Sequence, residues 1–243
     1  MIKVFLIHGA YGNPEENWFP WLKRELEIQG IKVTIPRFPT PANQTLSIWR
    51  KALSKYEKDL DKETIFVAHS LGPSFVLDIL ERSEIKIKAS FFVSGFVGLL
   101  GNPKFDEINK TFVDKDFDWQ KIRKTCSSFF LFHSNNDPYI PLEKAKQLST
   151  NLDAKLKIIR NAGHFNESSG YKTFPLLLKE IENFIQQQPE SSLSLIPHCE
   201  GLSGNTSLPC LLQPIYLQPL RWKKSLVWIS CSVGHARGVL RLA

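Results

Sequence analysis

A serine between two small residues is the part of this sequence best suited to covalent chemistry. Ser70 lies in the run Ala68-His69-Ser70-Leu71-Gly72, directly after an apolar stretch and directly before a helical pattern. In a tight strand-to-helix turn, side chains two positions before and after the serine would collide, so both positions must be small. Ala68 and Gly72 meet this requirement. The pattern predicts a nucleophile elbow that raises the Ser70 hydroxyl above the carboxyl end of a parallel sheet.

A serine hydroxyl is a weak nucleophile and needs a neighbouring base, which a third group must orient. Two polar turns downstream of Ser70 offer these residue types in the order acid, then histidine. Asp137 follows the predicted strand 128–132, and His164 follows the predicted strand 155–159. Both turns therefore lie at the same sheet edge as the serine. We predict that Ser70, Asp137 and His164 form a catalytic triad.

Other residues of the same types are less well placed. His133 lies at the end of a predicted strand but precedes the aspartate in the chain. His69 adjoins the serine and is expected to point away from it. The remaining candidates lie in an insertion or in the C-terminal segment: Asp114, Asp116, Asp118, His198 and His235.

Two backbone N–H groups are candidates for binding the oxyanion of the reaction. The N–H of Leu71 would lie at the N-terminus of a helix, where the helix dipole favours negative charge. The first predicted strand ends in Ile7-His8-Gly9-Ala10, and a small turn there would let the N–H of Ala10 or Tyr11 face the serine. A strand-end turn capped by His8 is compatible with this role.

The elements that must position these residues alternate along the chain. Short β-branched or aromatic runs are separated by longer amphipathic stretches, a pattern that predicts parallel strands with crossover helices on both faces of a sheet. We therefore expect an α/β fold with a doubly wound, mostly parallel sheet. The predicted strands are 3–7, 31–35, 64–68, 87–93, 128–132 and 155–159. The predicted helices are 15–29, 46–60, 71–82, 142–152 and 171–187.

The segment 98–124 interrupts this alternation. It is longer than a usual connection, and its four aromatic residues are expected to be exposed: Phe105, Phe112, Phe117 and Trp119. Long insertions in α/β domains often form lids over an active site. A surface excursion packed on the edge of the sheet is the alternative, and the sequence leaves both open.

The predicted sheet is complete by residue 187, so the sequence predicts a domain over 1–187 and an appended segment over 188–243. A linker-like run, 186–192, opens this segment, which is rich in proline and leucine and shows no lasting period. Three of the four cysteines lie in it, at spacings that match neither a zinc ribbon nor a redox pair. No metal site is expected, and the role of the segment stays open.

Composition excludes several classes of protein. The 243 residues carry a net charge of +7 with 42% hydrophobic and 23% charged residues, which excludes wholesale disorder. Both signs are interspersed, as in 51–62, a pattern typical of solvated helix faces and not of a nucleic-acid footprint. No apolar run approaches the roughly 20 residues that span a bilayer, and Met1-Ile2-Lys3 does not open a signal peptide. We predict a cytoplasmic protein without a transmembrane segment or nucleic-acid partner.

Several of these runs together resemble the family of small serine hydrolases that includes bacterial YdeN and mammalian retinoblastoma-binding protein nine. The resemblance covers about 2–187 and rests on Ile7-His8-Gly9, Asn17-Trp18-Phe19-Pro20-Trp21-Leu22, Val67-Ala68-His69-Ser70-Leu71-Gly72, Val93-Ser94-Gly95-Phe96, Asp137-Pro138 and Gly163-His164-Phe165. It implies an α/β-hydrolase fold with a reduced cap, the triad named above and no cofactor. The Leu-x-Cys-x-Glu motif associated with the mammalian member is absent, so that member's partner is not expected.

The sequence therefore favours a cofactor-independent serine hydrolase that cleaves small carboxyl esters, thioesters or short amides through an acyl-enzyme. Phe96, Trp18 and Phe165 adjoin the motifs and are candidates for lining an acyl pocket or for core packing. The alternative is a catalytically weak binding or scaffold protein on a hydrolase fold. Acyl transfer to an acceptor other than water also stays open, and no protein partner is indicated.

Overall fold

The computed structural model describes residues 1–187. The predicted segment 188–243 lies outside the described residues, so its separation from the domain stays a prediction.

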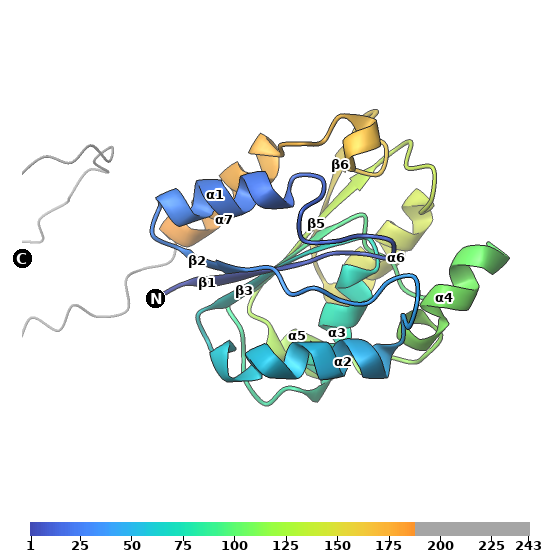
Figure 1. Ribbon diagram of the computed structural model, residues 1–243, viewed down its shortest axis with the longest axis horizontal. Helices are drawn as coiled ribbons and strands as arrows, with labels where there is room; N and C mark the ends of the chain where they lie inside the picture. The colour runs from blue at the N-terminus through green and yellow to red at the C-terminus, as the bar shows by residue number, and fades with distance from the viewer. Residues whose placement is uncertain (188–243) are drawn as a thin grey trace, which may run out of the picture. The chain divides into compact units, whose positions relative to one another are not determined.

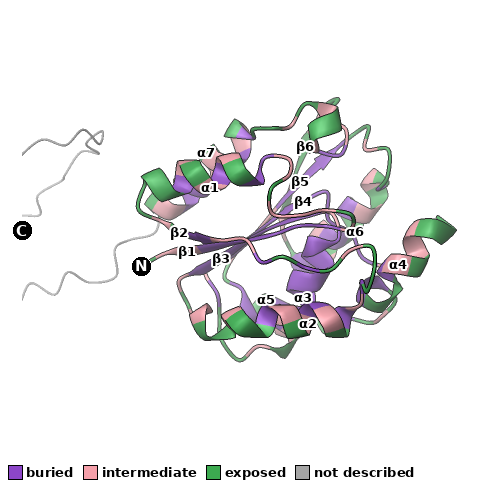
Figure 2. Cartoon of the chain, viewed as in Figure 1, coloured by how far each residue is buried: buried purple, intermediate pink, exposed green. Residues whose placement is uncertain are grey.

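Within residues 1–187, six parallel strands form one sheet in the order β2-β1-β3-β4-β5-β6. The strands are β1 (Lys3–Ile7), β2 (Lys32–Thr34), β3 (Thr64–His69), β4 (Ala89–Val93), β5 (Phe129–Ser134) and β6 (Lys155–Ile159). All six residues of β3 are buried, as are all five of β4. Strands covered on both faces favour continuous apolar runs over alternation, and Figure 2 shows the buried strands in the centre of the molecule.

Helices cover both faces of the sheet (Figure 1). One apolar core joins the sheet to α1 (Phe19–Ile28) and α7 (Pro175–Gln187). The other joins it to α2 (Leu46–Leu53), α3 (Gly72–Arg82), α4 (Pro103–Val113), α5 (Trp119–Thr125) and α6 (Leu142–Leu152). This arrangement confirms the predicted doubly wound α/β fold, with a sheet that is wholly parallel in the described part of the chain.

Several helices are shorter than the ranges predicted from the periodic spacing of their apolar residues. Helix α1 begins at Phe19 with Pro20 in its first turn, and α7 begins at Pro175. Proline lacks a backbone N–H and suits the first turn of a helix, so it marks the start in both cases. The predicted helix 46–60 is an α-helix only to Leu53 and continues as the 3₁₀ helix η1 (Ser54–Asp59).

The insertion 98–124 holds two helices with different surroundings. Helix α4 begins after Asn102, whose side chain accepts hydrogen bonds from two backbone N–H groups, and it reaches toward the carboxyl edge of the sheet. Helix α5 packs against α3 and the sheet. The prediction of exposed aromatics is wrong for Phe112 and Phe117, which are buried in the core. The apolar face of α4 turns Phe112 inward, and Phe117 packs from the connection between α4 and α5.

The order of the strands creates a crevice at the carboxyl edge. From β1 the chain moves outward to β2, then returns to β3 on the other side of β1. At such a switch point the connections leave in opposite directions, and ligands of open α/β sheets bind in the resulting crevice. The turns that follow β1 and β3 flank this crevice, and Gly9 and Ser70 lie in these two turns.

Candidate active site

Ser70 occupies a sharp turn between β3 and α3. Its φ of 60° lies in the left-handed region, where a non-glycine residue is strained. Its N–H donates to the carbonyl of Val93 at 2.9 Å, which ties the turn to β4. A Cβ on Gly72 would lie 2.5 Å from the carbonyl oxygen of Ile7, and a Cβ on Gly9 would lie 2.6 Å from the Cβ of Ser70. The turn after β1 therefore passes directly over the serine.

The structure brings His164 and Asp137 into contact. Nδ1 of His164 lies 2.8 Å from Oδ2 of Asp137. Asp137 follows β5, and its Oδ1 accepts from the N–H groups of Tyr139 and Ile140 at 3.0 and 3.1 Å. These bonds aim the carboxylate at the loop that follows β6, where His164 lies. Nδ1 can donate to a carboxylate only as N–H, so Nε2 keeps its lone pair for a proton.

The environment keeps Asp137 ionised although its side chain is buried. Burial on its own would raise the pKa of Asp137. Hydrogen bonds from His164, the Tyr139 N–H and the Ser94 hydroxyl outweigh this effect, and the pKa is lowered from its ordinary value. A buried carboxylate in this state stabilises positive charge on the neighbouring imidazole.

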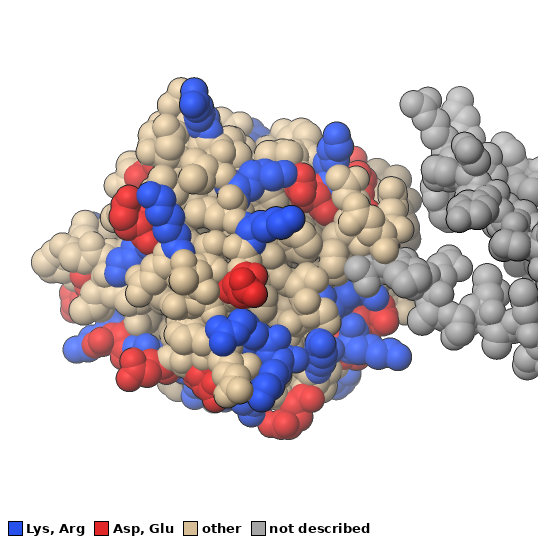
Figure 3. Space-filling view, turned by 180° about the vertical axis from the view of Figure 1, so that it is seen from behind, with Lys and Arg blue, Asp and Glu red and all other residues tan. Residues whose placement is uncertain are grey.

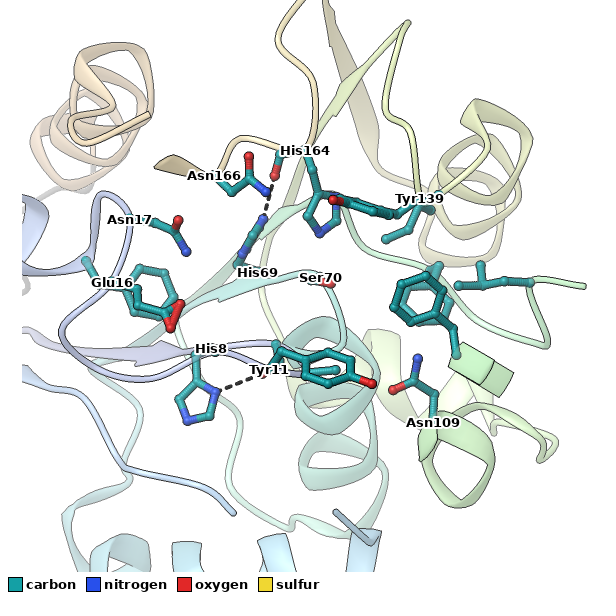
Figure 4. Close-up of a pocket in the computed structure, with 18 of the residues that line it drawn as sticks. His8, Tyr11, Glu16, Asn17, His69, Ser70, Asn109, Tyr139, His164 and Asn166 are labelled. Atoms are coloured by element: carbon teal, nitrogen blue, oxygen red, sulfur yellow. Dashed lines mark hydrogen bonds between the residues drawn. The ribbon is translucent and has the colours of Figure 1, made fainter. Parts of the chain in front are cut away.

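Ser70 and His164 line the same pocket. Figure 4 shows the His164 ring and the Ser70 hydroxyl facing this cavity from two different loops. These loops meet because both follow parallel strands at their carboxyl ends.

The two predicted oxyanion donors, Leu71 and Ala10, come from the turns after β3 and β1. Ala10 lines the pocket, and Leu71 directly follows Ser70. The N–H of Tyr11 donates to the Thr40 hydroxyl at 2.6 Å, whereas within residues 1–187 the N–H of Ala10 makes no hydrogen bond. Of the two alternatives for the second donor, the geometry therefore favours Ala10.

Comparison with known proteins was consistent with this geometry. A family model described as "Serine hydrolase" matches residues 4–183. The chain belongs to the serine hydrolase family. This finding confirms the resemblance drawn from the sequence and the prediction of a hydrolase.

Two relatives illustrate the family membership of this serine hydrolase. YdeN of Bacillus subtilis (strain 168) is 30% identical over 188 residues, which cover 76% of this chain and 97% of YdeN. Serine hydrolase RBBP9 of Rattus norvegicus is 28% identical over 169 residues, covering 68% of this chain and 88% of RBBP9. The crystal structure of the B. subtilis ydeN product matches with a TM-score of 0.73 over 77% of this chain and 100% of that chain.

More distant structures share the fold. Est1E from Butyrivibrio proteoclasticus, solved with ferulic acid, matches with a TM-score of 0.58 at 19% identity, covering 77% of this chain and 89% of that chain. At this identity the likeness supports the α/β-hydrolase fold alone.

Sequence reasoning missed a residue of this hydrolase that contacts the acid. Ser94 follows β4, and its hydroxyl donates to Oδ2 of Asp137 at 2.8 Å. Its φ of 49° is again left-handed. The run Val93-Ser94-Gly95 contributed to the family resemblance. A serine after a buried strand does not, however, indicate that its hydroxyl will bind Asp137. Only the pairing of β4 with β5 places the two side chains together.

His69 has a role that the sequence did not predict. It lines the pocket, and its Nε2 donates to the backbone carbonyl of His164 at 2.8 Å. The two rings lie 4.8 Å apart. Burial lowers the pKa of His69 to about 3, so the ring is neutral at ordinary pH. The turn at Ser70 redirects the chain, but His69 is still the last residue of β3 and its side chain follows the pleat of that strand.

The two other buried histidines of the site are structural. His8 Nδ1 donates to the carbonyl of Gly9 at 2.9 Å, and Nε2 accepts from the N–H of Phe38 at 3.1 Å. This is the capping role expected of His8. His133 Nε2 donates to the carbonyl of Ile140 at 3.0 Å and so holds the turn that carries Asp137. Its Nδ1 is buried without a hydrogen-bond partner in the described part of the chain.

The pocket has a volume of about 370 Å³, within the range of small-molecule sites. Of the three aromatic residues considered for an acyl pocket, Phe96 lines it. Trp18 and Phe165 belong to the core instead, where the indole N–H of Trp18 donates to the carbonyl of Phe165 at 3.0 Å. Helix α4 contributes Phe105 to the pocket wall. Of the two interpretations of the insertion, the lid therefore applies to α4, and the excursion packed on the rest of the domain applies to α5.

Other features of the described residues bear on possible ligands. No three His, Cys, Asp or Glu side chains of residues 1–187 converge to hold a metal ion. None of the helices in that range has the length and apolar character needed to cross a membrane. On the face seen in Figure 3, basic and acidic side chains are intermixed. The predictions of no metal, no nucleic-acid partner and a cytoplasmic location stay predictions.

Proposed function

We propose that this protein is a cofactor-independent serine hydrolase that cleaves small carboxyl esters, thioesters or short amides with Ser70, His164 and Asp137. The observation that carries this proposal is the 2.8 Å contact between His164 and Asp137, on the rim of the pocket that also holds the strained Ser70. The three residue types, their chain order and their common pocket are what acyl transfer through a serine requires.

In the first half of the reaction, the Ser70 Oγ attacks the carbonyl carbon of the substrate while Nε2 of His164 takes the hydroxyl proton. The carbonyl oxygen becomes an oxyanion, and Asp137 stabilises the imidazolium through Nδ1. The intermediate then collapses: the bond to the leaving alcohol, thiol or amine breaks, and Nε2 gives its proton to the leaving group. An acyl-serine ester remains.

In the second half, water takes the place of the leaving group. His164 Nε2 accepts a proton from water as its oxygen attacks the acyl carbon. Collapse of this second intermediate breaks the bond to Ser70, and the imidazolium returns the proton to Oγ. A carboxylic acid leaves and the enzyme is restored.

Two backbone donors would stabilise the oxyanion in both halves. Leu71 lies at the N-terminal end of α3, and the N–H of Ala10 makes no hydrogen bond in the described residues. Rigid N–H groups that already point at the developing charge need no reorganisation during the reaction. The turn over Ser70 is narrow enough that Gly9 tolerates no Cβ, which keeps Ala10 close to the serine.

A fluorophosphonate probe tests the proposal directly. An activated serine attacks the phosphorus and displaces the leaving group, so we expect a single covalent adduct that mass spectrometry maps to Ser70. The Ser70→Ala variant should fold and show no adduct. A folded wild-type protein without labelling, or labelling that persists in the variant, would refute the proposal.

The alternative function, a binding or scaffold protein, would require an inactive site and a partner that binds residues 188–243. Membership of the serine hydrolase family favours the enzyme, and the segment lies outside the described residues. Acyl transfer to another acceptor uses the same first half-reaction. The products of the labelled enzyme with an ester, in water with and without an added alcohol, would distinguish transfer from hydrolysis.

A further inference from the structure

One end of the active-site pocket carries hydrogen-bonding groups that the fold itself does not use. We propose that this end binds the hydroxyl groups of a polyol, so that the substrate is the ester of a small apolar acid with a polyhydroxy alcohol. The inference rests on the proposed function of Ser70 and specifies the leaving group. Glu16, Asn17, His69 and Asn166 form this polar end, to one side of Ser70 in Figure 4.

The rest of the pocket wall combines apolar side chains with the polar groups of Tyr11, Lys104, Asn109 and Tyr139. Phe96, Leu100, Phe105 and Ile140 contribute carbon surface there, and the Phe105 ring lies 5.8 Å from the ring of Tyr139. An apolar acyl group gains free energy from leaving water against such a wall. The pocket thus offers apolar surface for an acyl group in addition to the polar end for an alcohol.

Two amide groups of the polar end have donors to spare. Oδ1 of Asn17 accepts from the N–H of Glu167 at 2.7 Å, and Oδ1 of Asn166 accepts from the N–H of Ser169 at 3.1 Å. These bonds fix which atom of each amide faces the backbone. Nδ2 of Asn17 and Nδ2 of Asn166 make no hydrogen bond with any of residues 1–187 and face the pocket side of their loops.

The same end also has spare acceptors. Nε2 of His69 donates to the carbonyl of His164, so Nδ1 carries a lone pair, and no group in the described part of the chain donates to it. His69 lines the pocket, so a ligand bound there can donate to this atom. Glu16 adds a carboxylate, and the Asn13 amide donates to one of its oxygens.

This mixture of donors and acceptors selects among polar groups. A hydroxyl both donates and accepts, so neighbouring hydroxyls of a polyol match amide N–H groups and a histidine lone pair together. An ammonium group only donates and would leave both Asn side chains unpaired, which costs free energy in a pocket. The carboxylates beside Glu16 are already paired, Glu15 with Arg37 at 2.5 Å and Glu167 with Lys172 at 2.7 Å.

The polar end lies on the side of the leaving group. His164 must protonate the leaving oxygen, and His69 and Asn166 adjoin His164 through a hydrogen bond and through the chain. An alcohol whose ester oxygen lies near Nε2 of His164 therefore extends toward these residues. The acyl chain then lies toward α4.

Three butyrate esters with different alcohols test the inference. Propyl and 1-glyceryl butyrate share the acyl group and a three-carbon alcohol and differ by two hydroxyls, while choline butyrate presents a cation. We expect kcat/KM for the glyceryl ester to exceed that for the propyl ester by about tenfold, the effect of one or two added neutral hydrogen bonds. Equal values, or a preference for choline butyrate, would overturn the inference.

Two conservative variants locate the preference. Asn17→Asp and Asn166→Asp keep the oxygen that accepts from the backbone and remove the spare N–H donors. In each, the ratio of kcat/KM for glyceryl over propyl butyrate should fall about fivefold. Asn151→Asp makes the same chemical change at the end of α6, at the opposite edge of the sheet, and should leave the ratio unchanged. A ratio that survives in both pocket variants would overturn the assignment.

The two proposals fail in different ways. If no ester is turned over and the fluorophosphonate does not label Ser70, the proposed function fails and this inference with it. If Ser70 is labelled and propyl butyrate is cleaved as well as glyceryl butyrate, only the inference fails.

Discussion

Each oxygen of Asp137 has its own task. Oδ1 accepts two backbone N–H groups of the turn that follows it, and Oδ2 accepts from Ser94 and His164, four hydrogen bonds within the described residues. Oδ1 thus holds the side chain in place, and Oδ2 meets the imidazole. Because two elements besides its own turn anchor the carboxylate, a substitution of the acid can change the chemistry while the loop keeps its shape.

Asp137→Asn tests whether the chemical role of Oδ2 can be separated from the structural role of Oδ1. The amide retains the shape but turns an N–H toward Nδ1 of His164, which favours the tautomer that protonates Nε2 and removes the base. By analogy with serine proteases, we expect kcat to fall about 10⁴-fold while the thermal midpoint changes little. Ester hydrolysis and thermal unfolding measured on the same preparation check both parts. A variant with wild-type kcat would exclude Asp137 from the reaction.

The loop that carries His164 is held by side chains from the other half of the sheet. Gly163 and Phe165 adopt left-handed conformations on either side of the histidine, at φ of 55° and 53°. His69 donates to the carbonyl of His164, and Trp18 donates to that of Phe165. A loop with this backbone has few regular hydrogen bonds of its own, so these two donors replace them and fix the imidazole beside the serine.

At the scale of elements, one face of α4 has different tasks at its two ends. Phe105 contributes to the pocket wall, 6.4 Å from the ring of Tyr11, while Phe112 packs against Trp49 in the core at 4.8 Å. The spacing of seven residues places the two rings about two turns apart along the helix. The same helix thus anchors itself on the sheet and closes the acyl side of the pocket.

Phe105→Ala should therefore weaken acyl selectivity more than stability. In the wild type, kcat/KM for propyl esters should rise from acetate to hexanoate as methylenes fill the apolar side, and in the variant this rise should be smaller. Phe112→Ala is the contrast: removal of a buried ring costs about 3–5 kcal/mol of unfolding free energy. Chain-length profiles and urea unfolding of both variants distinguish the roles. An unchanged profile in Phe105→Ala would remove α4 from acyl binding.

The sequence predicts the bounds of a helix or strand well only where a residue or a change of period marks its ends. The bounds of β1, β6 and α6 agree with the prediction at both ends, since a proline or a change of period marks them. The start of α1 was predicted four residues early, because Trp18 continues the helical period of apolar residues, whereas 15–18 form turns. Helix α4 was not predicted as a helix, because the whole segment 98–124 was treated as an insertion, although Phe105, Ile108 and Phe112 recur at helical spacing.

The same reasoning separates predicted from missed site residues. Ser70, Asp137 and His164 each follow a strand in sequence, so a one-dimensional pattern suffices to find them. Ser94 and His69 contribute through partners 43 and 95 residues away. Contacts of that range depend on the order of strands in the sheet, which no local pattern contains.

At the scale of the whole molecule, the parallel sheet keeps three uncharged imidazoles inside the domain. His8, His69 and His133 are at most 5% exposed, and burial lowers the pKa of each, to about 3 for His69. In the unfolded chain each titrates near 6.5. Below that pH the unfolded chain therefore binds more protons than the folded protein, and the free energy of unfolding must fall as pH is lowered.

His69, whose folded pKa is about 3, gives a slope approaching about 1.4 kcal/mol per pH unit below pH 6, since one proton corresponds to about 1.4 kcal/mol, and the lowered pKa values of His8 and His133 add to it. Urea unfolding at pH 7, 6 and 5 should show this loss, which begins near pH 6.5 and ends as the folded pKa values are passed. His133→Gln keeps an N–H that can donate toward the Ile140 carbonyl but cannot titrate, so it should lower the slope. Stability that is flat from pH 7 to 5, or a slope equal in variant and wild type, would mean that these rings take up protons without unfolding.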